Sequence, residues 1–498
     1  MNIYPVVLIA YLAVLVFGVT ALGAKRTRSF EDFTTGRGIY GGLLLGLVVW
    51  ATKVTASAYM GGPALAYTFG FSVLPYGGWL VLSAIVVTII IFLPLRRLAL
   101  RLGAQTPMEV IGKRFESKPL YALYSLLVCF AITLSLIAQF KASGILMQQI
   151  AGFPMWLGVV VSAGSLLVYS FFGGRHAGIF SDAFQGLVMV AMVAIVIPKI
   201  WGLVGGITSM HAALSSQDPR LVAFTSKMFP LAAQIAMPFY WLFAFITQPY
   251  SMHLALSARS QKEVRKILVF EYLGYLTTLI WFIFVGFGGR ILFPGLKQPD
   301  ALAVVLLTKL LSPAFAALCL AVLWSIASIQ GGLVLTGASA IANDLYRGVL
   351  VPRYARGQSE ETIARRSVIL MRAVMSLMVA IAVVLTLVRT PPFLAIMMYV
   401  SFGLFGSAST GLFVGALWWR RATAAGGLVS MILGFAAYAV TERLVPGPFV
   451  AGAIGGAISL VSMFLVSLVT KAPRSELVER CFGAVTQRRL GSQGAMPG

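Results

Sequence analysis

The chain has 498 residues, of which 59% are hydrophobic and only 11% are charged. Runs of about 20 apolar residues recur along its whole length, each long enough to cross a bilayer as a helix, and this excludes an ordinary soluble globular protein. The net charge of +23 would suit nucleic acid, but the basic residues collect between the apolar runs, so we expect no nucleic-acid partner. The three cysteines and three scattered histidines have the spacing of neither a disulfide framework nor a metal site.

The apolar runs predict an all-α polytopic membrane protein with about thirteen transmembrane helices. A membrane β-barrel would instead show segments of about ten residues that alternate between polar and apolar. The expected spans are 3–23, 40–60, 73–95, 120–150, 155–173, 178–201, 229–255, 267–292, 313–343, 370–388, 393–418, 425–441 and 448–470.

Basic residues fix the expected orientation of these spans. With the N-terminus outside, 27 of the 38 lysine and arginine residues fall in cytoplasmic segments. This positive-inside bias predicts an external N-terminus and a cytoplasmic C-terminus. Lys25 and Arg26 follow the first span and no basic residue precedes it, which is the reverse of a cleavable signal peptide, so we expect a retained helix.

Without the first and the last two spans, ten spans remain, and they divide into two halves of five helices with opposite orientations. Such inverted repeats occur in many secondary transporters. The halves share no evident sequence similarity, so the repeat rests on the span count and on the resemblance described below. The expected parts are an N-terminal helix with the first cytoplasmic loop (1–39), the first repeat (40–201), an extracellular loop (202–228), the second repeat (229–418), two C-terminal helices (419–470) and a poorly ordered cytoplasmic tail (471–498).

Each half begins with an interrupted apolar run. Gly61-Gly62-Pro63 interrupts the first run, and Pro249 in "TQPYS" (247–251) interrupts the second. Broken helices at corresponding positions indicate a binding site near the membrane midplane. Lys53, just before the first interruption, places an ammonium within a span, where a charge is costly and usually functional.

Six segments, in this order, resemble the solute:sodium symporter family over about residues 3–470. The resemblance implies a leucine-transporter-like fold with 13 helices, and it suggests a bacterial cytoplasmic (inner) membrane. The segments are "TRSFEDFTTGRG" (27–38), "GGPALAYTFG" (61–70), "YSFFGGRHAGIFSDAFQGLVM" (169–189), "TQPY" (247–250), "SIASIQGGLVLTGASAIANDLYR" (325–347) and "FGSASTGLFVGALWWRRATAAGGLVSMILG" (405–434).

The resemblance also implies a sodium site, from which this sequence departs. In the family, two backbone carbonyls of the first broken helix, a small residue and two adjacent hydroxyls bind the ion. The matching positions are Ala51, Val54, Ser325, Ser328 and Ile329. Ile329 therefore replaces a hydroxyl. Lys53 stands where relatives that transport proline carry an aspartate and relatives that transport sugars carry an asparagine.

Three interpretations of Lys53 remain open. An ammonium about 4 Å from a sodium ion would repel it by about 4 kcal/mol at an effective dielectric of 20, so Lys53 could replace or weaken the ion site. Lys53 could instead contact an anionic substrate. It could also extend into a water-filled vestibule and coordinate nothing. Because burial lowers the pKa of lysine readily, Lys53 is in addition a candidate carrier of a transported proton.

Lys141 is a second cation deep in a span, on the helix that lines the substrate path in the family. The acidic residues within spans, Asp182, Glu271 and Asp344, lie near cytoplasmic ends, and none is placed to neutralise either lysine. An anionic substrate follows from this imbalance. The candidate substrate-binding residues are Lys53, Thr55, Ser57, Tyr59, Lys141, Tyr240, Gln248 and Tyr250, and Asp182 is the candidate for the cation pathway.

The sequence thus predicts a secondary active transporter that imports a small organic anion, monocarboxylate-like or an amino acid, by alternating access. With Lys53 and Ile329 in the ion site, we expect it to be sodium-independent or proton-coupled. The alternatives are a conventional sodium:solute symporter and a transporter-like sensor that acts through a separate partner. No nucleophile–base pair, metal cluster or phosphate loop indicates an enzyme. We expect no cofactor beyond a coupling sodium ion or proton, and a monomer as the working unit.

Overall fold

The computed structural model describes residues 3–26, 42–53, 55–246, 248–258, 260–328, 331–354, 357–388, 393–445 and 447–483. Within these ranges the chain is helical almost throughout, and no β-strand occurs. Short π-helical and 3-10 segments connect or continue several of the α-helices. The predicted all-α class is therefore confirmed.

The helices follow one another with short connections. Those of the first part are α1 Ile3–Ala13, η1 Val14–Val19, α2 Thr20–Arg26, α4 Gly42–Lys53, α5 Ala56–Phe69, η2 Gly70–Val73, α6 Leu74–Val87, η3 Thr88–Phe92, α7 Leu93–Leu102, α8 Pro107–Phe115, α9 Lys118–Ala151, α10 Met155–Val204, α11 Gly206–Gln217 and η4 Pro219–Val222. Those of the second part are α12 Leu231–Ile246, α13 Pro249–Ser257, α14 Gln261–Trp281, η5 Phe282–Gly288, α15 Gly289–Leu292, η6 Pro299–Ala301, α16 Leu302–Leu310, α17 Pro313–Ser328, α18 Gly331–Ser339, η7 Ala340–Leu350, α19 Val351–Tyr354, α20 Glu360–Val388, α21 Leu394–Trp418, α22 Ala424–Leu444, α23 Pro448–Val469 and α24 Ser475–Phe482.

Eleven helical stretches of the described residues are long and apolar enough to cross a membrane. The expected spans at 40–60 and 229–255 are divided between α4 and α5 and between α12 and α13. The 50 residues of α10 cover two expected spans, 155–173 and 178–201. At about 1.5 Å per residue, they suffice for two crossings of a hydrocarbon layer about 30 Å thick.

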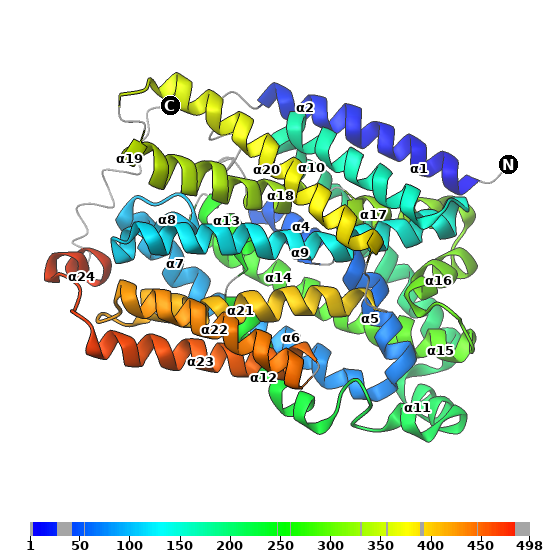
Figure 1. The fold of residues 1–498 in the computed structure, drawn as a ribbon. Coiled ribbons are helices and arrows are strands. Elements are labelled where there is room, and N and C mark those ends of the chain that lie inside the picture. Colours follow the sequence, from blue (N-terminus) through cyan, green and yellow to red (C-terminus); the bar gives the residue numbers. More distant parts are fainter. Residues whose placement is uncertain are drawn as a thin grey trace.

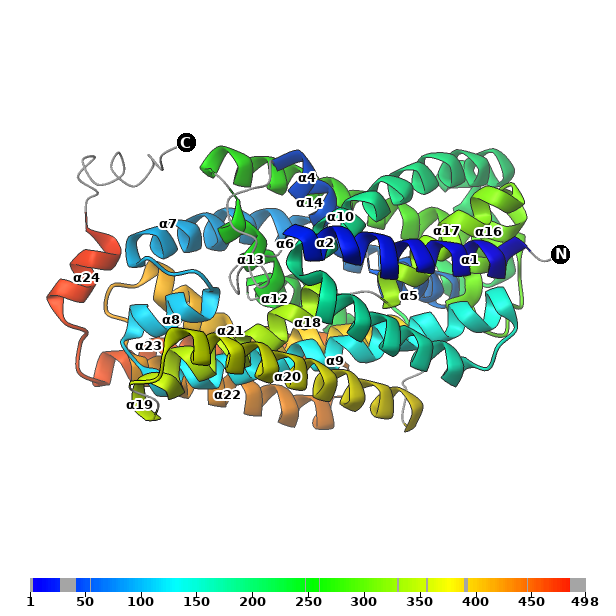
Figure 2. The same ribbon diagram turned by 90° about the horizontal axis from the view of Figure 1, so that it is seen from above.

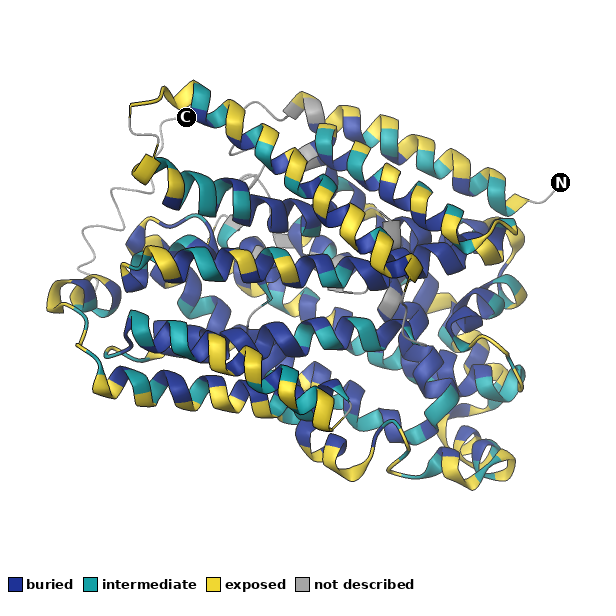
Figure 3. Cartoon of the chain, in the orientation of Figure 1, coloured by how far each residue is buried: buried dark blue, intermediate teal, exposed yellow. Residues whose placement is uncertain are grey.

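The helices lie roughly alongside one another (Figure 1). The N-terminus is at the same end as α16, whereas α8, α19 and α24 are at the opposite end, and the view from above agrees (Figures 1 and 2). Exposed positions lie on the outward faces of the peripheral helices (Figure 3). Many of them are large apolar side chains, such as Phe17 (74% exposed) and Val469 (85%). Such a surface suits contact with lipid.

The first helix break lies earlier than the sequence indicated. α4 ends at Lys53 and α5 begins at Ala56, and between them Thr55 has an extended backbone and accepts a hydrogen bond from Ala58 N at 3.2 Å. Thr55 is thus the N-cap of α5. The expected interruption at Gly61-Gly62-Pro63 is wrong, because α5 continues through these residues.

Tertiary contacts explain why α5 tolerates Pro63. A proline has no N–H to donate to the carbonyl four residues earlier, here that of Tyr59. The indole Nε1 of Trp281 donates to this carbonyl at 2.9 Å, and the two aromatic rings stack at 4.8 Å. Gly62 serves close packing instead, since a Cβ there would lie 2.0 Å from the ring of Phe282.

The second break lies within the expected "TQPYS" segment. α12 ends at Ile246, Gln248 has an extended backbone, and Pro249 is the first residue of α13. Proline is favoured at the first position of a helix, because its missing N–H would have no intrahelical partner there.

The beginning of the C-terminal tail is ordered, contrary to expectation. Residues Ser475–Phe482 form the helix α24, which buries Leu477 and Cys481. Arg101 donates a hydrogen bond to the carbonyl of Cys481 at 2.7 Å, and the Arg114 guanidinium lies over the Phe482 ring. Apolar residues on one face of a short helix therefore dock this segment onto the cytoplasm-facing helices α7 and α8.

Candidate functional site: a cavity between the two helix breaks

A cavity lies between the two helix breaks. Its space is about 960 Å³ when its open mouth is included, a size typical of small-molecule sites. Residues of both breaks line it, Thr55 at the first and Gln248 and Pro249 at the second. The remaining lining residues are Ala58, Tyr76, Leu80, Ala131, Ile132, Ser135, Gln139, Trp241, Ala244, Phe245, Ser251, Tyr275, Thr278, Phe282, Leu333, Met398, Ser401, Phe402 and Phe405.

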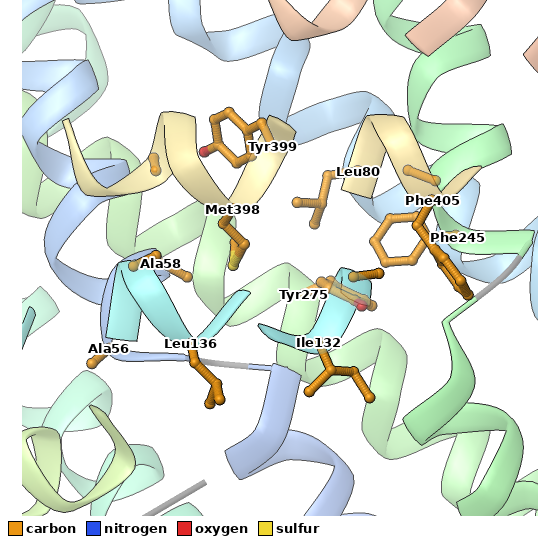
Figure 4. Close-up of a cluster of buried hydrophobic side chains, with 14 of the residues drawn as sticks. Ala56, Ala58, Leu80, Ile132, Leu136, Phe245, Tyr275, Met398, Tyr399 and Phe405 are labelled. Atoms are coloured by element: carbon orange, nitrogen blue, oxygen red, sulfur yellow. The ribbon is translucent and has the colours of Figure 1, made fainter. Parts of the chain in front are cut away.

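Most of the cavity wall is apolar. Ile132, Phe245, Tyr275, Met398 and Phe405 reach it from α9, α12, α14 and α21 (Figure 4). A few hydroxyls and amides supply polarity, and one polar point is well fixed. Ser401 donates to the carbonyl of Ala131 at 2.8 Å and lies 2.9 Å from Ser135 Oγ. None of the described lining residues carries a formal charge.

Aromatic residues form one side of the cavity and are held by a chain of hydrogen bonds. The Tyr240 hydroxyl donates to the carbonyl of Tyr399 at 2.7 Å, and the Tyr399 hydroxyl donates to the Tyr76 hydroxyl at 2.6 Å. Tyr76 and Trp241 line the cavity and meet edge to face at 5.2 Å. Such packing fixes the rings in place, so the wall is preorganised.

Trp241 offers the cavity a hydrogen-bond donor. Its side chain is fully buried, and its Nε1 has no hydrogen-bond partner among the described residues. A buried donor without an acceptor is costly. A ligand oxygen in the cavity would satisfy it.

The eight candidate substrate-binding residues fall into three groups. Thr55 and Gln248 line the cavity. Tyr59 and Tyr240 are buried outside its lining, with Tyr59 against Trp281 and Tyr240 behind the aromatic wall. The side chains of Lys53, Ser57 and Tyr250 lie outside the described part of the structure, and Lys141 is considered next. Their roles in binding stay predictions.

Lys141 has an acidic neighbour that the sequence did not reveal. Its side chain is 8% exposed and interacts electrostatically with Asp300, which is 4% exposed in η6. The expectation that no carboxylate could neutralise Lys141 is therefore wrong. The reason is that Asp300 belongs to a loop between spans that folds back against α9. Lys141 is also absent from the described cavity lining.

The expected cation-site residues are only partly described. Ala51 is buried near the end of α4. Ser325 Oγ accepts a hydrogen bond from Gln185 Nε2 at 2.7 Å and donates to the carbonyl of Val322 at 3.2 Å. Internal hydrogen bonds thus engage this hydroxyl. Val54, Ile329 and the side chain of Ser328 lie outside the described residues.

Asp182, the candidate for the cation pathway, is 8% exposed on α10, three residues before Gln185. Its charge reaches Tyr11 of α1. The N-terminal helix therefore contributes to this polar cluster. Whether Asp182 guides a cation stays a prediction.

Several lining residues escaped the sequence reasoning. Ser135 and Gln139 precede Lys141 on α9, and Ser401 lies on α21. The lysine drew attention to the α9 segment, and Gln139, two residues earlier, was an available signal. Ser401 and Thr278 offered none, because a single hydroxyl in an apolar helix commonly bonds to its own backbone.

Comparisons with known proteins give a consistent result. The model of the sodium:solute symporter family matches residues 33–434. A sodium/pantothenate symporter of Escherichia coli (strain K12) is 28% identical over 449 residues, which cover 88% of this chain and 90% of the relative. A sodium/pantothenate symporter of Haemophilus influenzae is 25% identical over 451 residues, with coverage of 88% and 90%.

Among solved structures, a Na⁺-coupled sialic acid symporter in a substrate-bound, outward-open state superposes with a TM-score of 0.77. The alignment covers 95% of this chain and 99% of that one, at 18% identity. At this identity the likeness establishes the fold alone. The expected transporter fold is thus confirmed, whereas the number of thirteen spans and the inverted repeat stay predictions.

Proposed function

Because the chain belongs to the sodium:solute symporter family, it is a membrane-embedded secondary transporter of a small solute rather than an enzyme, and we propose that this solute is a small organic anion. The resemblance identified from the sequence is thereby confirmed. The proposal concerns the chemistry of the solute and the coupling ion, and alternating access of the cavity to the two sides of the membrane is its mechanism.

The observation that carries the proposal is the composition of the cavity beside the first helix break. Its described wall is apolar and uncharged, with scattered hydroxyls and amides and the unpartnered donor of Trp241. Lys53 is the last residue of α4, two positions before the lining residue Thr55. A solute with a carboxylate for Lys53, an oxygen for Trp241 and an apolar body matches this site.

A monocarboxylate of the pantothenate type fits these requirements, and amino acids are the next class. The curated relatives named above transport pantothenate according to their names. A cationic solute would meet no described carboxylate in the cavity lining.

For coupling, we propose that sodium does not bind at the family's site in this chain. Lys53 and Ile329 occupy positions that the family resemblance assigns to that site. The hydroxyl of Ser325 is already engaged by Gln185. We further propose an external N-terminus, a cytoplasmic C-terminus and a bacterial inner membrane, with 40–201 and 229–418 as inverted repeats. The opposite placement of the N-terminus and α24 supports this orientation (Figure 1).

Conventional sodium symport is the second candidate, because the family and both curated relatives are described as sodium-dependent. Uptake by purified protein in liposomes separates the two. We expect radiolabelled pantothenate, or another monocarboxylate of a panel, to accumulate without sodium. We also expect Trp241→Phe to raise its KM about fivefold or more, the cost of one lost hydrogen bond. Accumulation that requires a sodium gradient would establish the second candidate, and uptake of choline with no anion transported would contradict the first.

A further inference from the structure

Glu271 is a buried carboxylate next to the cavity that the proposed function leaves unused. It lies on α14 and is 4% exposed. Tyr275 and Thr278, which line the cavity, follow it by four and seven residues, so all three share one face of the helix. The Thr88 hydroxyl lies 3.4 Å from Glu271 Oε2, and the charge of Glu271 reaches Tyr275.

The packing of α14 against α4 places Glu271 near the level of Lys53. A Cβ on Gly46 would meet the Phe270 ring at 2.4 Å, and a Cβ on Gly274 would lie 3.6 Å from Trp50. Both pairs have the same offset, so the two helices run parallel. Lys53 follows Gly46 by seven residues and Trp50 by three, and its backbone position therefore belongs to the stripe of α4 that faces α14.

Lys53 is also the titratable residue that α4 contributes. Around α14, the other titratable residues are Tyr59 on α5, Tyr76 on α6 and Asp182 on α10. Arg96 on α7 donates a hydrogen bond to the carbonyl of Leu256, and His253 is buried on α13. Lys53 is thus the cation whose helix packs directly on the helix of Glu271.

Charge balance decides what this arrangement can do. An isolated charge inside a membrane protein is costly, whereas a lysine and a glutamate together are neutral. If an anion joined this pair, one negative charge would be left over. A proton on Glu271 removes it, and Lys53 then balances the anion alone.

We propose that Glu271 is the site of the coupling proton and that it takes up one proton when the substrate anion binds beside Lys53. The inference rests on the proposed function. A proton from the external solution forms an O–H bond with a carboxylate oxygen of Glu271. This bond breaks when the cavity opens to the cytoplasm, and the proton and the anion leave together. The cycle moves one proton with one anion and is electroneutral.

The first test needs no substrate. In infrared difference spectra of the purified protein, wild type should show a carboxylic acid C=O band that disappears as the pH rises. Glu271→Gln should lack this band, and Glu442→Gln, which alters a half-buried carboxylate on the peripheral helix α22, should keep it. In Lys53→Met, which removes the opposite charge, the band should persist to a pH about 1 to 3 units higher.

The second test measures coupling, with pantothenate as the probe in liposomes. A gradient of one pH unit should support about tenfold accumulation by wild type, independent of an imposed membrane potential. Glu271→Gln should lose this accumulation and keep the exchange of internal for external pantothenate. A band that survives in Glu271→Gln, or that Lys53→Met leaves unmoved, overturns the inference. Absence of pantothenate uptake by wild type that shows the expected bands overturns the pantothenate assignment and leaves the Glu271–Lys53 pair established.

Discussion

Single side chains compensate for residues that would otherwise disrupt this fold, and Trp281 is the clearest example. Its indole supplies the hydrogen bond to the carbonyl of Tyr59 that Pro63 cannot make within α5. Trp281→Phe keeps an aromatic ring at this place and leaves the buried carbonyl without a donor, which costs about 1–3 kcal/mol. We therefore expect a lower midpoint of thermal unfolding in detergent.

A double-mutant cycle isolates this bond. Pro63→Ala restores the N–H that can donate to Tyr59, so Trp281→Phe should cost about 1 kcal/mol less in the Pro63→Ala background than in wild type. Equal costs in both backgrounds would show that the indole stabilises the protein through packing alone.

Asp300 gives the pH dependence of stability at the same scale. Burial raises the pKa of this carboxyl from 3.8 to about 6, against the opposing charge of Lys141. The folded state therefore holds the proton more tightly than the unfolded state between these two values, and stability falls as the pH rises through this window. About two pH units of difference amount to about 3 kcal/mol.

Thermal unfolding of wild type and Asp300→Asn at pH values from about 4 to about 7 checks this expectation. The wild-type midpoint should fall across the window, and Asp300→Asn should lack that part of the decline. A wild type whose stability rises over the same range, with Asp300→Asn identical to it, would show that the carboxyl ionises freely.

At the scale of helices, close packing of α21, α22 and α23 depends on glycine. A Cβ on Gly434 would lie 2.0 Å from the carbonyl oxygen of Ser407, and a Cβ on Gly411 would lie 2.2 Å from that of Ser459. Both acceptors belong to the backbone of a neighbouring helix and cannot rotate away. Gly434→Ala should therefore push α22 away from α21 and destabilise the protein by about 1–3 kcal/mol.

Gly164→Ala on α10 is the matched control, because a Cβ there meets nothing within 4 Å. Alanine should be neutral or stabilising by up to about 1 kcal/mol at this helical position. Thermal unfolding of both variants in one detergent checks the contrast. Equal effects of the two substitutions would mean that helix propensity, and not the approach of α22 to α21, sets the result.

For the whole molecule, the sequence predicted the architecture better than the site. Apolar runs and basic loops are long-range averages, so they indicated the helical membrane fold and the two interrupted helices. The position of the first break was misjudged, because Gly61, Gly62 and Pro63 carry a turn-like composition while Trp281 and Phe282, over 200 residues away, hold them in a helix. Asp300 was overlooked as the neighbour of Lys141 for the same reason, since only tertiary folding brings η6 to α9.

The central claim is that this transporter works without sodium at the family site because Lys53 stands there. Thermal unfolding of purified wild type and Lys53→Ala in sodium chloride and in equal choline chloride tests it without a known substrate, since a ligand of the folded state raises its stability. We expect no difference between the salts for wild type and a sodium-dependent rise of the midpoint for Lys53→Ala. Stabilisation of wild type by millimolar sodium would contradict the claim and identify a sodium symporter in which Lys53 serves the substrate alone.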